Sequence, residues 1–144
     1  MSVTPEPKPA AANGADYVME ALRGRVLVAD DSDVFLAVAA SVISATSTLR
    51  LVGAVGSGLE AIRLLPQLRP DLVLLDFRMP GMDGVQTTRI IRRNEPRTVV
   101  MVISAEPEGL SEVAEAAGAA ATLHKRDFVP STLEALWLKH MPDG

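Results

Sequence analysis

The side chains of this chain that are suited to chemistry stand at the ends of short apolar runs. They are two adjacent carboxylates, a third carboxylate, a hydroxyl and an ammonium: Asp30, Asp31, Asp76, Ser104 and Lys125. Three carboxylates gathered around one ammonium remain net negative, so they repel one another unless a cation lies among them. Every candidate ligand atom is an oxygen, which favours a hard ion, and Mg²⁺ fits best. The residue types therefore predict a Mg²⁺ site.

The same set also suits a carboxylate that attacks phosphorus. Such a nucleophile needs a metal to hold the phosphoryl oxygens, a hydroxyl donor and a fixed positive charge. Asp76 can supply the nucleophile, the acidic pair the metal site, Ser104 the hydroxyl and Lys125 the charge. Each has an ordinary alternative, because acids cap helices, a serine after a strand starts a turn and an exposed lysine is solvated. Their joint appearance favours the chemical interpretation.

Five apolar segments are predicted to be strands, at residues 26–29, 51–55, 72–75, 98–103 and 121–124. The third, Leu72-Val73-Leu74-Leu75, is apolar at every position. A run without alternation is typical of a strand covered on both faces of a parallel sheet. Asp76 then lies at the carboxyl end of a buried strand.

Helical spacing of apolar residues predicts a helix after each strand, at residues 33–45, 59–68, 84–93, 110–117 and from 131 onward. Ser32 or Asp33, then Asp83, then Ser131 are the predicted N-caps of the first, third and last of these helices. Arg69-Pro70 and Gly118 follow the second and fourth helices, where such residues end helices.

Five strands alternating with five helices predict an α/β fold, a doubly wound five-stranded parallel sheet with helices on both faces. Right-handed crossovers place all carboxyl ends of the strands at one edge of the sheet. Open α/β sheets bind their ligands at that edge. We therefore expect the five polar side chains to converge there from four strands.

Composition excludes several other classes of protein. Hydrophobic residues make up 48% of the 144 residues and aromatic residues only 3%, so aliphatic side chains must fill the core. The absence of cysteine excludes disulfides and thiolate metal sites. A net charge of −4 leaves no basic surface for nucleic acid. No apolar run approaches the roughly 18 residues of a membrane span, and a cytoplasmic protein without membrane or nucleic-acid partners is predicted.

The chain is predicted to have three parts. Residues 1–22 are a flexible Pro- and Ala-rich tail with a short helix at 15–22. Residues 23–141 form the folded domain, and residues 142–144 are terminal. Because little sequence follows the last helix, no separate output module is expected.

Four motifs resemble those of a response-regulator receiver domain of two-component signalling. They are Asp30-Asp31 after the first strand, Asp76 with the following Met79-Pro80-Gly81-Met82-Asp83-Gly84, Ser104-Ala105 after the fourth strand, and Gly118-Ala119 before Lys125. The second motif is highly specific, and the resemblance covers residues 24 to about 141. It implies a flavodoxin-like strand order, 2-1-3-4-5, and a single-domain regulator similar to the chemotaxis receivers.

The resemblance also implies a role for each acid. Asp76 would accept a phosphoryl group from a phosphohistidine of a sensor histidine kinase or a histidine phosphotransfer protein. Asp31, Asp76 and the backbone carbonyl of Arg78 would ligate Mg²⁺, with Asp30 acting through water.

By the same resemblance, Ser104 would bond one phosphoryl oxygen and Lys125 would pair with another. The protein would signal by protein contact or by phosphorelay to a downstream protein. It would catalyse only its own phosphorylation and dephosphorylation, so it is not predicted to be an enzyme in the ordinary sense.

Several positions depart from the family pattern. Thr122 stands three residues before the lysine, where the family commonly has an aromatic side chain that moves inward on activation. Arg126 replaces a frequent cis proline. Arg78 and Glu106 each lie two residues beyond a site residue, where an Arg-Glu pair would shield the acyl phosphate from water.

Three alternatives remain open from the sequence. One is a receiver-like adaptor that works without phosphorylation, which Thr122 favours. Another is a phosphatase with an aspartyl nucleophile, suggested by Asp31-Ser32-Asp33. The third is a flavin-binding module, although its phosphate would meet an acidic loop after the first strand.

Overall fold

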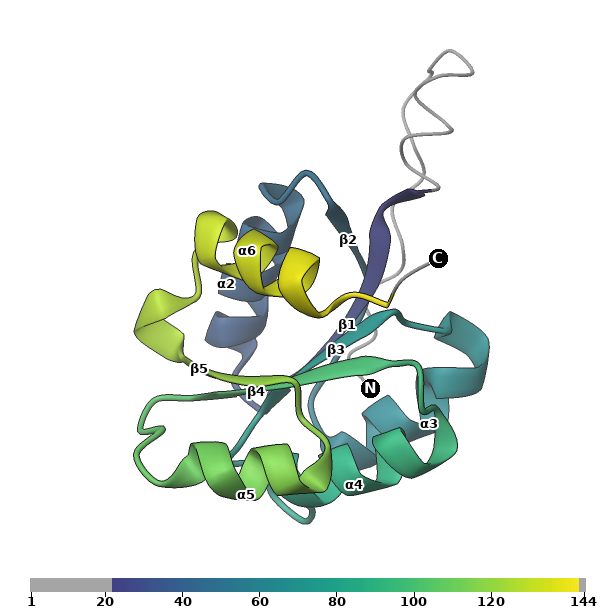
Figure 1. Cartoon of the computed structure of the whole chain (residues 1–144), viewed down its shortest axis with the longest axis vertical. Coiled ribbons are helices and arrows are strands. Elements are labelled where there is room, and N and C mark those ends of the chain that lie inside the picture. The colour runs from purple at the N-terminus through teal and green to yellow at the C-terminus, as the bar shows by residue number, and fades with distance from the viewer. Residues whose placement is uncertain (1–21, 143–144) are drawn as a thin grey trace.

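Five parallel strands form one sheet in the order β2-β1-β3-β4-β5. The structure is a computed structural model that describes residues 22–142 (Figure 1). The strands are β1 (Gly24–Ala29), β2 (Leu49–Val55), β3 (Leu72–Asp76), β4 (Val99–Ser104) and β5 (Ala121–His124). The predicted α/β class and strand order are therefore confirmed.

Helices cover both faces of the sheet, as Figure 1 shows. They are α2 (Asp33–Ser44), α3 (Gly58–Leu68), α4 (Gly84–Asn94), α5 (Leu110–Ala117), α6 (Pro130–His140) and a short 3₁₀ helix, η1 (Lys125–Asp127). Helices α2 and α6 lie on one face, and α3, α4 and α5 lie on the other. This is the predicted doubly wound arrangement.

The middle strand shows why its sequence does not alternate. Leu72 and Leu74 of β3 pack in the cluster under α2 and α6, whereas Val73 and Leu75 pack in the cluster on the opposite face. All five residues of β3 are buried. Since successive side chains of a strand point to opposite faces, a strand covered on both sides must be apolar throughout.

The helix starts near the site follow from local capping. Ser32 caps α2 by accepting a hydrogen bond from the Phe35 backbone N–H at 3.2 Å. Asp83 and Gln86 form a capping box at the start of α4, in which each side chain accepts from the other residue's backbone N–H. Both predicted caps are confirmed, with Ser32 chosen over Asp33.

The predicted cap of the last helix is wrong. Helix α6 begins at Pro130 with Val129 as its N-cap, so Ser131 lies inside the first turn. Proline suits the first helical position because its fixed φ matches the helix and its missing N–H would have no partner there.

The first two strands begin earlier than predicted, and β1 shifts register against β2 between Val26 and Leu27. The predicted tail and its short helix fall outside the described residues, except for Leu22. Among residues 22–142, none of the helices combines the length and apolar character needed to cross a membrane.

Candidate functional site

Strand pairing brings the predicted side chains to one edge of the sheet. Asp76 is the last residue of β3 and pairs with Ile103, the residue before Ser104. Ser104 in turn pairs with His124, the residue before Lys125. The carboxyl ends of β3, β4 and β5 therefore lie side by side, and the acidic pair follows β1, the other neighbour of β3.

Three carboxylates form a tight cluster at this edge. One oxygen each from Asp30, Asp31 and Asp76 lies within 4.8 Å of the other two. The Asp30 side chain is completely buried and Asp76 is 7% exposed, whereas Asp31 is exposed. The cluster is thus anchored in the protein and open to solvent on the Asp31 side.

The donor set fits a hard divalent cation. Asp30 Oδ1 accepts a hydrogen bond from the Ser32 backbone N–H at 2.8 Å, and Asp30 Oδ2 is buried. Its nearest counter-charge is Lys125 Nζ at 3.0 Å. Three carboxylates against one ammonium leave excess negative charge among oxygen ligands, which suits Mg²⁺. Asp31 and Arg78 also line one cavity of about 420 Å³.

Lys125 bridges two of the carboxylates. Its ammonium nitrogen lies 3.0 Å from Asp30 Oδ2 and 3.3 Å from Asp76 Oδ1. Burial by itself lowers the pKa of Lys125, but the hydrogen bond to Asp30 and the charges of Asp76 and Asp30 outweigh it and raise the pKa above its ordinary value. Lys125 therefore remains protonated and positively charged beside Asp76.

Asp76 is a carboxyl group with an unusual pKa. Burial, followed by repulsion from Asp30, raises the pKa of Asp76 from its ordinary 3.8 to about 6, although the nearby Lys125 lowers it. Repulsion from Asp31 adds to the rise. At neutral pH Asp76 is mostly ionised, yet it holds its charge less favourably than an exposed aspartate does.

Ser104 is buried at the end of β4. Its hydroxyl oxygen accepts a hydrogen bond from the Glu106 backbone N–H at 3.0 Å. A hydroxyl that accepts one hydrogen bond still has its own O–H to donate. The loop after β4 therefore orients Ser104 without using its donor.

Gly84, at the start of α4, allows the chain to turn closely under Asp76. A Cβ atom at this position would lie 2.6 Å from the Asp76 carbonyl oxygen and 3.0 Å from Phe77 Cα. The Gly84 N–H donates to the Phe77 carbonyl at 2.8 Å. Glycine is required here because backbone approaches backbone.

Phe35 borders the site and was not singled out from the sequence. The Lys125 ammonium lies 4.4 Å from the centroid of the Phe35 ring, and the Phe35 and Phe128 centroids are 5.5 Å apart. The available signal was the position of Phe35 in the first turn of a helix that starts beside the acidic pair. Sequence spacing alone does not reveal which side chain faces the lysine.

The positions that depart from the family pattern lie around the same edge. Thr122 is half-buried on β5 and pairs with Val102. Arg78 and Glu106 line one cavity of about 410 Å³, and the Arg78 guanidinium carbon lies 5.7 Å from the centroid of the Phe77 ring. The peptide bonds of residues 22–142 are all trans, including the one after Lys125.

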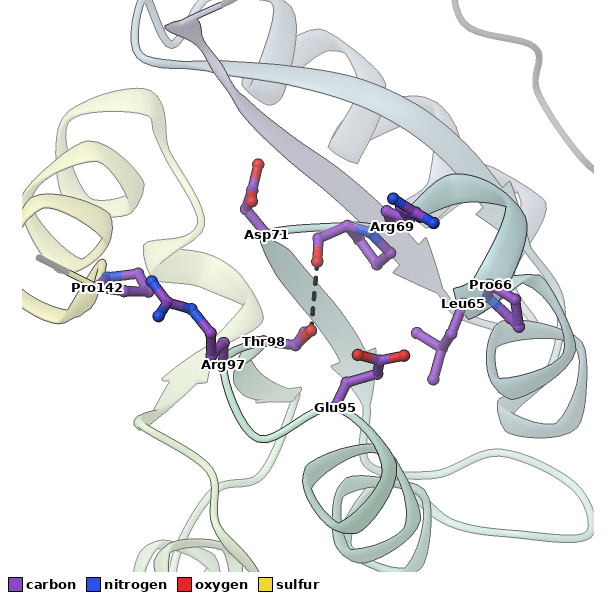
Figure 2. A pocket seen from close by; sticks show the side chains of 9 residues that line it. Leu65, Pro66, Arg69, Asp71, Glu95, Arg97, Thr98 and Pro142 are labelled. Atoms are coloured by element: carbon purple, nitrogen blue, oxygen red, sulfur yellow. Dashed lines mark hydrogen bonds between the residues drawn. The ribbon is translucent and has the colours of Figure 1, made fainter. Parts of the chain in front are cut away.

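Another cavity, of about 520 Å³, lies at the other end of the strands, where β3 and β4 begin. Figure 2 shows it between the residues that precede β3 and β4, with Arg97 extending toward Pro142 and the Thr98 hydroxyl directed at the Pro70 carbonyl, 3.3 Å away. Its charged lining residues are two arginines and two acids, Arg69, Arg97, Asp71 and Glu95. None of the predicted site residues lines it, so it is separate from the carboxylate cluster.

The chain matches the response regulator receiver domain family over residues 26–136. A protein-glutamate methylesterase/protein-glutamine glutaminase of Saccharophagus degradans is 38% identical over 106 residues, covering 74% of this chain and 28% of that protein. One from Hahella chejuensis is 34% identical over 112 residues, covering 78% of this chain and 28% of that protein. This chain thus spans little more than a quarter of the length of these relatives.

Solved structures agree with the family match. The signal receiver domain of NarL from Mycobacterium tuberculosis has a TM-score of 0.70 at 34% identity, covering 79% of this chain and 96% of that one. The response regulator domain of Thermotoga maritima CheB has a TM-score of 0.75 at 27% identity, covering 85% and 99%. The chain therefore belongs to the response regulator receiver domain family of two-component signalling.

Proposed function

We propose that Asp76 accepts a phosphoryl group from a phosphohistidine, carried by a sensor histidine kinase or a histidine phosphotransfer protein, in a Mg²⁺-dependent reaction. The observation that carries the proposal is the position of Lys125 Nζ, 3.3 Å from Asp76 and 3.0 Å from Asp30, within a cluster that holds one further carboxylate, Asp31. This places a nucleophile, a fixed positive charge and candidate metal ligands around one point. The proposal includes a cytoplasmic location, where such donors would reach the site.

The transfer follows from the chemistry of these groups. An ionised oxygen of Asp76 forms a bond to phosphorus as the phosphorus–nitrogen bond of the donor breaks, and the electron pair remains on the imidazole nitrogen. Lys125 pairs with one phosphoryl oxygen and Ser104 donates its O–H to another. A bound Mg²⁺, held by Asp31, Asp76 and the Arg78 carbonyl with Asp30 acting through water, would neutralise the remaining phosphoryl charge.

The test is phosphorylation of the purified protein by a small donor. Wild-type protein incubated with phosphoramidate and Mg²⁺ is expected to gain a mass of about 80 Da, the mass of an added PO₃ group. The same incubation with EDTA is expected to give no adduct. Intact-protein mass spectrometry reads both results directly.

Two outcomes would contradict the proposal. An unmodified wild-type protein in the presence of Mg²⁺ would favour the adaptor that works without phosphorylation. Steady turnover of a phosphate ester that survives Asp76→Ala but not Asp31→Ala would favour an aspartyl phosphatase. We propose that the receiver acts on no substrate beyond its own phosphoryl group, and that its output is contact with a downstream protein or onward phosphoryl transfer.

Mg²⁺ is expected to stabilise the folded protein. A ligand that binds only the folded state at ten times its Kd adds about 1.4 kcal/mol to the free energy of unfolding. Thermal melts with 10 mM MgCl₂ and with EDTA measure the effect, and a rise of a few degrees is expected. Asp31→Asn removes a ligand from the exposed side of the cluster, so it should abolish the rise.

Asp33→Asn is the matched control for this Mg²⁺ effect. Asp33 is an exposed acid two residues further along, in the first turn of α2, and it is not part of the carboxylate cluster. Its variant should keep the full rise in melting temperature. An equal loss in both variants would point to general charge screening and against a bound ion.

The Arg78→Ala variant is expected to lose its phosphoryl group severalfold faster than wild type. Arg78 and Glu106 line one cavity that also includes Phe77, the residue after the acceptor, so their side chains can limit the access of water to an acyl phosphate on Asp76. The decay of the 80 Da adduct after removal of the donor measures the rate, with Arg89→Ala, on the same cavity, as the control. Equal decay in wild type and Arg78→Ala would remove this role.

A further inference from the structure

The ammonium of Lys125 has a third neighbour besides its two carboxylates. It lies 4.4 Å from the centroid of the Phe35 ring, within the range in which a cation is attracted to a ring face. The Lys125 side chain is 25% exposed, so its remaining open direction is toward solvent. The ammonium is therefore enclosed by Asp30, Asp76 and an aromatic ring.

Phe35 is itself held firmly. It lies in the first turn of α2, and its backbone N–H donates to the Ser32 cap at 3.2 Å. Its ring packs against Phe128 with centroids 5.5 Å apart and an interplanar angle of 42°. Both rings are nearly buried, in the core cluster that also contains Leu133 and Trp137 of α6. A ring fixed in this way can act as a wall for the ammonium.

We propose that Phe35 is a positioning residue for Lys125, whose ring face keeps the ammonium beside Asp76 and limits its excursions into solvent. A lysine side chain has four rotatable carbon–carbon bonds, so its ammonium can occupy many positions. An aliphatic side chain in place of Phe35 would exclude water but would not attract the ammonium. The inference rests on the proposed function, because it assigns Phe35 to the phosphoryl transfer that Lys125 assists.

The contact itself can be tested without phosphorylation. The chain has three lysines, Lys8, Lys125 and Lys139, so their ε-methylene NMR signals are easily distinguished. Ring currents from Phe35 should move the Lys125 signal upfield of the other two in wild type. Phe35→Leu should remove the upfield shift, and Val34→Ala, at the exposed neighbouring position, should retain it.

The role in phosphoryl transfer is tested by rates. With phosphoramidate and saturating Mg²⁺, Phe35→Leu should be phosphorylated about 2- to 30-fold more slowly, the range that a cation–π contact corresponds to. Phe35→Tyr, which keeps the ring, should restore a rate close to that of wild type. Val34→Ala, at the exposed neighbouring position on the same turn of α2, should phosphorylate at the wild-type rate.

A second measurement separates positioning from general damage to the site. Phe35 contacts Lys125 and is not a metal ligand, so Phe35→Leu removes no group that binds Mg²⁺. An ammonium that moves away from the carboxylates repels the ion less, so the Kd for Mg²⁺ should be equal to or lower than that of wild type. A loosened site would bind Mg²⁺ more weakly and phosphorylate more slowly at once. Should Phe35→Leu melt below the assay temperature, Phe35→Met serves as the second aliphatic variant.

The outcomes distinguish this inference from the proposed function. A wild type that forms the adduct while Phe35→Leu matches its rate would overturn the inference and leave the proposed function intact. A wild-type Lys125 signal without an upfield shift would overturn it as well. A wild type that forms no adduct would remove the proposed function, and with it any role of Phe35 in transfer.

Discussion

Asp76→Asn is expected to take up no phosphoryl group under conditions that modify the wild type. Asparagine matches aspartate in size, but its amide is not a nucleophile toward phosphorus, so the fold is kept and the reaction is lost. Intact mass after incubation with phosphoramidate and Mg²⁺ measures the result. The control is Asp127→Asn, an exposed acid of η1 near Lys125, which should give a full adduct. Modification of Asp76→Asn would show that another side chain accepts the group.

The same substitution is expected to stabilise the metal-free protein. Folding raises the pKa of Asp76 from 3.8 to about 6, chiefly through burial and repulsion from Asp30. The folded state therefore binds this proton more tightly than the unfolded state. Stability from this group is fully present below about pH 4 and is lost as pH rises through about 6. At about 1.36 kcal/mol per pKa unit the loss at pH 7.5 is about 3 kcal/mol.

Urea unfolding in EDTA at pH 4.5 and pH 7.5 measures this loss of stability with rising pH. Asparagine does not titrate, so the free energy of unfolding of Asp76→Asn relative to wild type should grow by about 2 kcal/mol between those two pH values. A constant difference would mean that Asp76 has an ordinary pKa and that the cluster does not strain the metal-free state. Saturating Mg²⁺ should shrink the advantage of the variant at pH 7.5.

Gly84→Ala is expected to cost at least about 3 kcal/mol of stability, the upper end of the range for overpacked sites. The new Cβ would lie 2.6 Å from the Asp76 carbonyl oxygen and 3.0 Å from Phe77 Cα. Both contacts are backbone, so no side chain can rotate away. Because β3 is completely buried, relief must come from a shift of the start of α4, which displaces the preceding loop that carries Arg78. Urea unfolding measures the loss, and the rate of phosphorylation should fall with it.

Gly81→Ala is the comparison that isolates this clash. Gly81 has a positive φ of 81° but open space around its missing Cβ. Alanine there should cost only about 1 to 2 kcal/mol of backbone strain, and phosphorylation should be little changed. Equal effects of the two substitutions would mean that loop strain, and not contact with Asp76, makes Gly84 necessary.

The sheet and its functional edge were predictable because their signals are local. An apolar run such as residues 72–75, followed by an acid and turn residues, indicates a buried parallel strand, and topology then gathers the strand ends. Ser32 and Asp83 were predictable as caps for a similar reason, since a cap bonds to a backbone group two or three residues away.

The contacts that tune the site were not predictable, because they join side chains distant in sequence. Phe35 and Lys125 meet only after α2 has packed on the sheet and β5, which precedes Lys125, has paired with β4. The raised pKa of Asp76 depends on burial and on Asp30, which a sequence does not report. The start of α6 was mistaken because Ser131 is a good cap by type, while the neighbouring Pro130 fits the first helical position better.

The complete burial of β3 limits which parts of this protein can change conformation. Its five residues are flanked by strands on both sides and covered by helices on both faces, so the backbone that carries Asp76 has no room to travel. Any rearrangement must be carried by segments beyond the strand ends, which have fewer close-packed neighbours. Under the proposed phosphorylation, Asp76 would therefore stay in place, and any change of conformation would lie in the segments around it.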